Sequence, residues 1–428
     1  MKSHNPIVTW SRPALSSIGV SAIETRPRDS APEKASFGFD VFRPGLDETG
    51  QTLRQLQLVG RSDSCLVSEW AAPPDPDEVE VALFGPGKGE CVVVHLGSNE
   101  WMVVDSCLGD DRNPAASTYL TSLGVAPESV RLIVASHWHD DHVGGLGKLV
   151  EQYAEAEVFC SAALEADELF HLVAAADQRP MVATTSGVHE FRRVLDALDD
   201  RDGTLRFGIA DRILYRRTAA PGCEVQALSP SDASKREGLE HLSTLLDLQT
   251  MADERRTVPR PLRNPGAVVV WVHVGDVRLL LAADLEVDAD PRKGWLAVLD
   301  AAAAPKGRAG FVKVAHHGSE NGHEDRVWQE MLEEEVYAGL TPYLSGRTPI
   351  PRPTDVQRIV ALTPNCWMTR SPGTPKVKRD WRIERMVDEA ALWLRASEVG
   401  NAGALRYRRR VTGGSWRVHA SGSARRLT

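Results

Sequence analysis

Short apolar runs, several of which end in charged or polar residues, recur along the chain. Their Val, Leu and Ala content and their Gly, Ser or Asn boundaries are typical of buried strands. Turn residues at 97–99 and 275–276 separate neighbouring runs, which predicts two hairpins. The predicted strands cover residues 79–85, 90–96, 100–106, 132–136, 223–229, 267–274, 277–284, 310–314 and 337–345.

Apolar residues at three- and four-residue spacing predict helices between these strands. They cover residues 117–123, 146–154, 162–176, 327–336, 354–362 and 380–396. Residues 1–75 mix Pro, Gly, Ser and charge with short apolar pieces, which predicts an extension ending in a linker. We expect one main domain over residues 76–428, with inserted helices over about 160–215 that flank the site and a basic region over 371–428.

The composition is that of a soluble globular protein, with 42% hydrophobic and 25% charged residues in 428. No window approaches the roughly 18–20 apolar residues that span a bilayer, and the N-terminus lacks the apolar core of a signal peptide. The six cysteines form no C-x-x-C pair, which is typical of reduced thiols. We therefore expect a cytoplasmic protein with no membrane contact.

The net charge of −9 argues against a protein that coats nucleic acid nonspecifically. Lys and Arg nevertheless outnumber Asp and Glu from residue 371 onward. This basic region is either a surface for polyanions or a solvated face.

Candidate metal ligands follow directly on the predicted strand at residues 132–136. In extended chain His137 and His139 project to the same side. Asp141 and His142 come next, where a glycine pair lets the backbone turn before a helix, so both can point to the same place. Ligand-type side chains at this spacing predict a metal site.

Two later strands also end in residues that bind metals. Asp284 ends the strand after the second hairpin turn, and its two oxygens could contact two ions. The strand at residues 310–314 opens onto His316 and His317. Alternation places Lys313 and His317 on one side of this strand and His316 on the other.

The sequence of residues 137–142 resembles the ligand signature of the metallo-β-lactamase-fold hydrolases. The resemblance implies an αββα sandwich of the α/β class, with one or two divalent ions at one end of the sheets. It favours His317, which is followed by Gly and Ser319, as a ligand, with His316 as the alternative. It also implies that Asp105, which follows a buried strand, holds the ligands in orientation.

Three further features are similar to the hydrolase domain of the ComEC competence proteins and their soluble relatives. These are Gly-Lys-Gly at residues 87–89, the strand pair ending in Asp284, and Lys-Val-Ala-His-His-Gly-Ser at residues 313–319. The likeness spans roughly residues 78–370.

The chain departs from this pattern in three places. His139 stands where the ComEC branch often has Asp, and Ile-Pro-Arg-Pro at residues 350–353 replaces a later His-Pro. Polar residues also replace the histidine that completes the first metal site in most of the superfamily. We expect that Asp232 or water fills that place, or that this site binds its ion more weakly. His241 is a poor substitute because the sequence around it predicts a helix.

The resemblance implies two divalent ions, Zn²⁺ or Mn²⁺, with Asp284 between them. The first ion would be held by His137 and His139, and the second by Asp141, His142 and His317. A hydroxide between the ions would attack phosphorus, with Asp141 orienting it or taking its proton. Lys313, Ser319 or the basic region could hold the flanking phosphates.

We therefore expect a metal-dependent phosphodiesterase or nuclease. One alternative is a hydrolase of a thioester, lactone or other small-molecule ester, which a pocket lined with aromatic rather than basic residues would favour. Another is a component of a multi-protein bacterial system, such as antiviral defence, regulated by a partner that binds the N-terminal extension.

Overall fold

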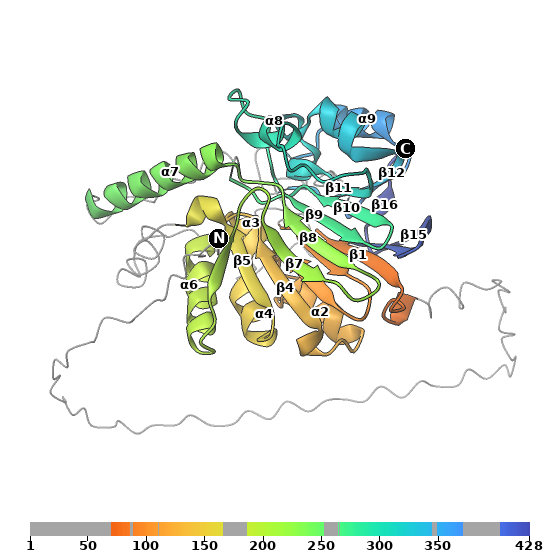
Figure 1. Ribbon diagram of the computed structural model, residues 1–428, viewed down its shortest axis with the longest axis horizontal. Coiled ribbons are helices and arrows are strands. Elements are labelled where there is room, and N and C mark those ends of the chain that lie inside the picture. The colour runs from red at the N-terminus through yellow and green to blue at the C-terminus, as the bar shows by residue number, and fades with distance from the viewer. Residues whose placement is uncertain are drawn as a thin grey trace, which may run out of the picture. The chain divides into compact units, whose positions relative to one another are not determined.

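Two mixed β-sheets lie face to face, and helices cover their outer faces (Figure 1). This arrangement confirms the predicted αββα sandwich. The described residues lie within the compact unit Trp70–Thr428. The computed structural model describes residues 70–85, 89–109, 111–165, 186–251, 264, 266–344, 349–370 and 403–428.

The first sheet combines an antiparallel and a parallel half. From β14 to β3 the strands are antiparallel to their neighbours, and from β3 to β6 they are parallel. Helices α2 (Ala115–Ser122), α4 (Leu146–Gln152) and α6 (Ser186–Asp199) cover its outer face. Its order is β15 (Gly413–Ser421), β14 (Ala404–Arg410), β1 (Glu78–Phe84), β2 (Cys91–His95), β3 (Trp101–Val104), β4 (Val130–Ala135), β5 (Glu157–Ser161) and β6 (Leu205–Gly208).

The second sheet has the same mixed character, with β7 to β10 antiparallel and β10 to β13 parallel. Helices α8 (Gly294–Leu299) and α9 (Pro353–Leu362) pack on its outer face. Its order is β16 (Arg425–Arg426), β13 (Cys366–Met368), β12 (Leu332–Leu340), β11 (Ala309–Lys313), β10 (Val277–Leu281), β9 (Val270–Val274), β8 (Cys223–Ala227) and β7 (Ile213–Arg217).

Strand β2 illustrates why the runs in the sequence are almost continuously apolar. Val92 and Val94 face the second sheet, while Cys91 and Val93 face the helices. Successive side chains of a strand point to opposite faces, so a strand buried on both faces needs apolar residues at nearly every position.

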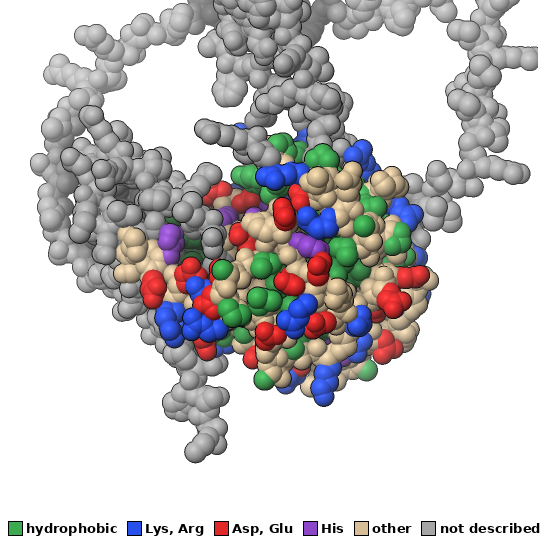
Figure 2. Space-filling model, turned by 90° about the horizontal axis from the view of Figure 1, so that it is seen from above, with side chains coloured by type: hydrophobic (Ala, Val, Ile, Leu, Met, Phe, Trp, Pro, Cys, Tyr) green, Lys and Arg blue, Asp and Glu red, His purple; other side chains and the backbone are tan. Residues whose placement is uncertain are grey.

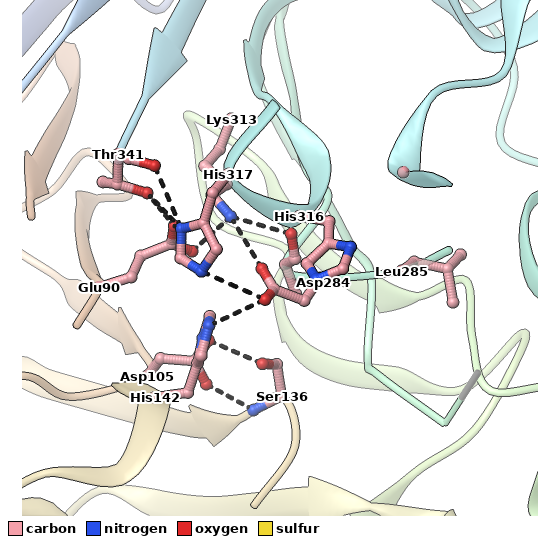
Figure 3. Close-up of polar contacts among 12 residues, drawn as sticks. Glu90, Asp105, Ser136, His142, Asp284, Leu285, Lys313, His316, His317 and Thr341 are labelled. Atoms are coloured by element: carbon pink, nitrogen blue, oxygen red, sulfur yellow. Dashed lines mark hydrogen bonds and ion pairs between the residues drawn. The ribbon is translucent and has the colours of Figure 1, made fainter. Parts of the chain in front are cut away.

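The ends of the parallel strands position the candidate site. Strands β3 and β4 of the first sheet and β10, β11 and β12 of the second each run parallel to a neighbour. The segments after their C-terminal ends carry the polar residues that meet between the sheets, in the region drawn in Figure 3. The fold thereby brings together side chains that are far apart in sequence.

Two predicted helical regions are corrected by the structure. The helix predicted over residues 327–336 is a π-helical turn, Val327–Met331, after which β12 starts at Leu332. Leu332 pairs with Ala309 of β11, and regular pairing resumes at Tyr337 after a register shift, so the sheet extends further toward the N-terminus than the sequence spacing predicts. Within the region predicted as inserted helices, α6 is helical, but β6 and β7 are edge strands of the two sheets.

The prediction for the C-terminal region is corrected at two arginines of its described part, residues 403–428. Strand β14 pairs with β1, which places Arg406 and Arg408 against Glu80. Both guanidinium groups donate hydrogen bonds to Glu80 Oε2, at 2.9 and 2.5 Å, and both side chains are buried. These two arginines are therefore neither a polyanion surface nor a solvated face.

Several predictions fall outside the described residues. They include the extension as far as residue 69, the Gly-Lys pair at 87–88, most of the predicted helix 162–176, and the helix 380–396. Partner binding by the extension stays a prediction. None of the helices in the described part of the chain is long and apolar enough to cross a membrane.

Candidate metal centre

The loop after β4 delivers the first candidate ligands. Strand β4 ends at Ala135, and the short helix α3 (Asp140–Val143) carries Asp141 and His142. The chain then turns at Gly145, whose φ of +79° lies in the left-handed region. A Cβ there would also lie 2.7 Å from Leu108 Cδ2, but that leucine is exposed and can move, so the left-handed φ is the main reason for a glycine at this turn.

Asp141, His142, Asp284 and His317 offer ligand atoms that all lie within 4.8 Å of one another. His142 Nε2 lies 3.3 Å and His317 Nε2 also 3.3 Å from Asp284 Oδ2. Asp141 Oδ2 lies 3.4 Å from His317 Nε2. Figure 3 shows the two imidazoles converging on Asp284 from opposite sheets.

A second group, formed by Asp105, His137 and His142, shares one histidine with the first. Asp105 follows β3 and accepts three hydrogen bonds. The donors are Ser136 N at 2.6 Å, Ser136 Oγ at 2.7 Å and His142 Nδ1 at 2.7 Å. Asp105 therefore orients a ligand-type histidine and the start of the loop, in the manner of outer residues at metal sites.

Hydrogen bonds set the orientation of three imidazoles. His142 Nδ1 donates to Asp105, and His317 Nδ1 donates to the Thr341 carbonyl oxygen at 3.1 Å. The hydroxyl proton of Ser136 goes to Asp105, so His137 Nδ1 donates to Ser136 Oγ at 2.9 Å. Each ring thus keeps its Nε2 for another partner.

No hydrogen-bond partner among the described residues satisfies these three buried Nε2 atoms or Asp284 Oδ1. Unpaired buried polar atoms are costly, and several that face one place call for an explanation. Imidazole nitrogen and carboxylate oxygen are ligands of Zn²⁺ and Mn²⁺. The donor set therefore fits a divalent metal ion.

The charges in this centre are strongly coupled. Burial alone lowers the pKa of His142, but Asp284, Asp105 and Asp141 outweigh it and raise that pKa well above its ordinary value. Burial likewise lowers the pKa of His317, but the carboxylates of Asp284 and Asp141 beside its Nε2 raise it to about 9. Without a metal, the two rings balance the carboxylates as imidazolium ions.

Lys313 does not occupy the position that its predicted role in phosphate binding requires. It is fully buried, and its Nζ lies 2.5 Å from Glu90 Oε1 and 3.5 Å from Asp284 Oδ1. It also donates to the Ala283 carbonyl oxygen at 2.8 Å. Because this ammonium group lies beneath Asp284, it cannot hold a phosphate that enters from solvent, and that prediction is corrected.

The other predicted residues lie at the edge of the centre or outside it. The ring of His139 lies 4.7 Å from that of His137, but His139 belongs to neither group. His316 turns to Asn321 Oδ1, at 2.9 Å from its Nδ1, and is also outside both groups. Asp232 begins α7 (Asp232–Met251), is exposed, and joins neither group, so it does not fill the third ligand position.

The sequence alone did not single out Glu90 or Thr341. Thr341 Oγ1 donates a hydrogen bond to Glu90 Oε2, and the two residues are 251 positions apart. Glu90 opens an apolar run and could have been noticed as a charge next to a buried strand. Thr341 carries no such signal.

A cavity of about 320 Å³ adjoins the first two histidines. His137 and His139 line one side of it. Other walls come from the end of β5 and the segment after it, from α7, and from residues 264, 266 and 267. The described lining residues include Trp138, Leu164 and Leu242 but no Lys or Arg.

The fold of this chain is similar to that of known proteins. Residues 84–327 match the profile of the metallo-beta-lactamase superfamily. Rm3 metallo-beta-lactamase is 17% identical, with 60% of this chain and 83% of that chain covered and a TM-score of 0.29. The metallo-beta-lactamase fold protein YhfI from Bacillus subtilis is 12% identical, with 55% and 70% covered and a TM-score of 0.28. A comparison with curated proteins finds no significant match.

Proposed function

The chain belongs to the metallo-β-lactamase superfamily, and we propose that it is a metal-dependent phosphodiesterase or nuclease with two divalent ions, Zn²⁺ or Mn²⁺. The observation that carries this proposal is the meeting of Asp141, His142, Asp284 and His317 beside His137, whose buried Nε2 is also unpaired among the described residues and whose ring lies 4.2 Å from that of His142. A ligand-type histidine next to a four-residue donor set supports a second ion, and dinuclear sites stabilise both the attacking and the leaving oxygen in phosphoryl transfer.

The residues have separate tasks in this proposal. Asp284 would contact both ions, His137 and His139 would hold the first, and Asp141, His142 and His317 the second. Bound ions would supply Lewis acidity and an activated water. Asp105, Glu90 and Thr341 hold ligand residues in position, while Lys313 balances the charge of Glu90 and Asp284.

Asp141 is the best candidate for orienting the attacking water. Its side chain is 18% exposed, whereas that of Asp284 is 3% exposed. His142 and His317 outweigh the effect of burial and hold the pKa of Asp141 well below its ordinary value. Its carboxylate is therefore ionised at neutral pH and can accept a hydrogen bond from the attacking water, but its low pKa makes it a weak proton acceptor.

The decisive experiment measures cleavage of labelled single- and double-stranded DNA and RNA with Mn²⁺ or Zn²⁺. Asp284→Ala and His137→Ala should abolish metal-dependent cleavage. Asp276→Ala is the matched control, because Asp276 is exposed at the opposite end of the β9–β10 hairpin. Cleavage that survives in Asp284→Ala, or no cleavage by a protein shown to hold two ions, would refute the nuclease proposal.

A second candidate is hydrolysis of a thioester, lactone or other small-molecule ester. The observation that favours it is the cavity beside His137 and His139, whose described lining includes Trp138 and several aliphatic side chains and no Lys or Arg. Turnover of such esters, without cleavage of nucleic acid, would select this candidate.

A further inference from the structure

The cavity beside His137 and His139 contains polar atoms that the fold leaves unpaired. Asn264 Oδ1 and His241 Nε2 are buried and have no hydrogen-bond partner among the described residues. Both side chains line the cavity, and Asn264 is 6% exposed. Buried polar groups are normally satisfied, so these two indicate a ligand that supplies hydrogen bonds.

The rest of the lining defines the kind of ligand. Trp138 offers an aromatic surface, and Leu164, Leu242 and Ala267 offer aliphatic ones. A phosphate would find no Lys or Arg among the described lining residues, and Lys293, which contacts the lining residue Glu237 at 2.9 Å, is already paired. An acyl chain would satisfy the aliphatic surfaces but would leave Asn264 Oδ1 and His241 Nε2 unpaired.

A nucleobase satisfies both requirements, since its faces stack on apolar and aromatic side chains and its edge carries donors and acceptors. Asn264 Oδ1 can accept from an exocyclic amino or ring N–H group. His241 Nε2 can donate or accept, according to its tautomer. The volume of about 320 Å³ lies at the small end of the roughly 300–1,000 Å³ range of ligand pockets, as suits one base rather than a duplex.

The charges on one face of the molecule are mixed. On the uncovered part of the face drawn in Figure 2, Lys and Arg side chains lie among Asp and Glu side chains of the described residues and form no continuous basic stripe. A protein that grips a duplex by its phosphates needs a basic stripe. A base also cannot enter a closed pocket while it is paired and stacked.

We propose that this cavity binds the unpaired base next to the scissile phosphodiester, so that the substrate is a single-stranded nucleic acid. This inference rests on the proposed function. It assigns Asn264 and His241 to base recognition, and His137 and His139 at the cavity wall place the base beside the metal centre.

The test compares an oligothymidylate with an oligomer of the same length and charge whose sugars carry no bases. With Mn²⁺, kcat/KM should be about tenfold or more higher for the base-containing oligomer, the change expected from stacking one base. Asn264→Ala and His241→Gln should bring this ratio close to one. Glu240→Gln, at the exposed neighbour of His241 on α7, should leave the ratio as in the unaltered protein.

Equilibrium binding of both oligomers to metal-free protein provides a readout that does not depend on catalysis. Binding that requires bases and is weakened about tenfold in Asn264→Ala supports the pocket, and Asn264→Asp serves if the alanine variant fails to fold. If such binding occurs without any cleavage, the proposed function fails and the pocket stands. Equal binding and equal cleavage of the two oligomers would overturn the pocket, as would duplex cleavage at the single-strand rate.

Discussion

Asp105 allows the metal centre to be tested without touching a proposed ligand. It accepts hydrogen bonds from Ser136 N, Ser136 Oγ and His142 Nδ1. In Asp105→Asn one oxygen becomes an amide donor, so at least one of these donors loses its acceptor. Asn is the suitable replacement because the φ of Asp105 is +59°, and Asn tolerates this left-handed conformation better than Ala.

The expected effect of Asp105→Asn is a 10- to 100-fold loss of metal affinity, or about 1.4–2.7 kcal/mol, because the imidazole of His142 is no longer held in one orientation. Competition with a chromophoric chelator measures the Zn²⁺ affinity directly. Asp211→Asn is the matched control, since Asp211 has a φ of +68° and is exposed. A Zn²⁺ affinity within twofold of the unaltered protein would refute the role assigned to Asp105.

Three further predictions concern buried charge. Lys313→Met should destabilise the fold by about 3–5 kcal/mol because Glu90 is left without its counter-ion, and adding Glu90→Leu should restore most of the loss in chemical unfolding. Zn²⁺ binding at pH 7 should release on the order of two protons, because His142 and His317 carry raised pKa values; calorimetry in buffers of different ionisation enthalpy measures this number. Burial lowers the pKa of His95 from 6.5 to about 4. As the pH falls below 6.5, the unfolded chain therefore binds a proton at this histidine before the folded protein does. The free energy of unfolding should fall by up to about 3 kcal/mol as the pH drops from 6.5 to 4. Urea unfolding at pH 7.5 and 4.5 should show a smaller pH effect in His95→Gln, and an unchanged effect would contradict this assignment.

Much of the fold could be predicted from local pattern. The apolar runs locate most strands, because strands buried on both faces need apolar residues at nearly every position. Residues 332–336 were misjudged because they share the spacing of a helix, whereas Leu332 pairs with Ala309 and these residues extend β12 across a register shift. Such pairing depends on residues distant in sequence and cannot be read from the segment itself.

The predicted site residues also differ in whether the local sequence determines their positions. His137, Asp141 and His142 stand in one short motif, so their proximity follows from sequence. The burial of Lys313 does not, because alternation gives the side of the strand but not what covers it. Composition likewise showed that the C-terminal region contains arginines. It did not show that Glu80 of β1 neutralises two arginines of β14, because these strands are more than 300 residues apart in sequence.

A network of polar contacts next to the centre connects the two sheets. The network therefore contributes to folding and, in the proposed function, to metal binding. Glu90 immediately precedes β2 of the first sheet, while Lys313 ends β11 and Thr341 follows β12 of the second. Lys313 contacts Glu90 and Asp284, and Glu90 in turn accepts from Thr341, whose carbonyl oxygen accepts from His317. The position of His317 and Asp284 therefore depends on how the two sheets pack. Because binding energy for the folded state adds to its stability, an ion held here would also hold the two sheets in register.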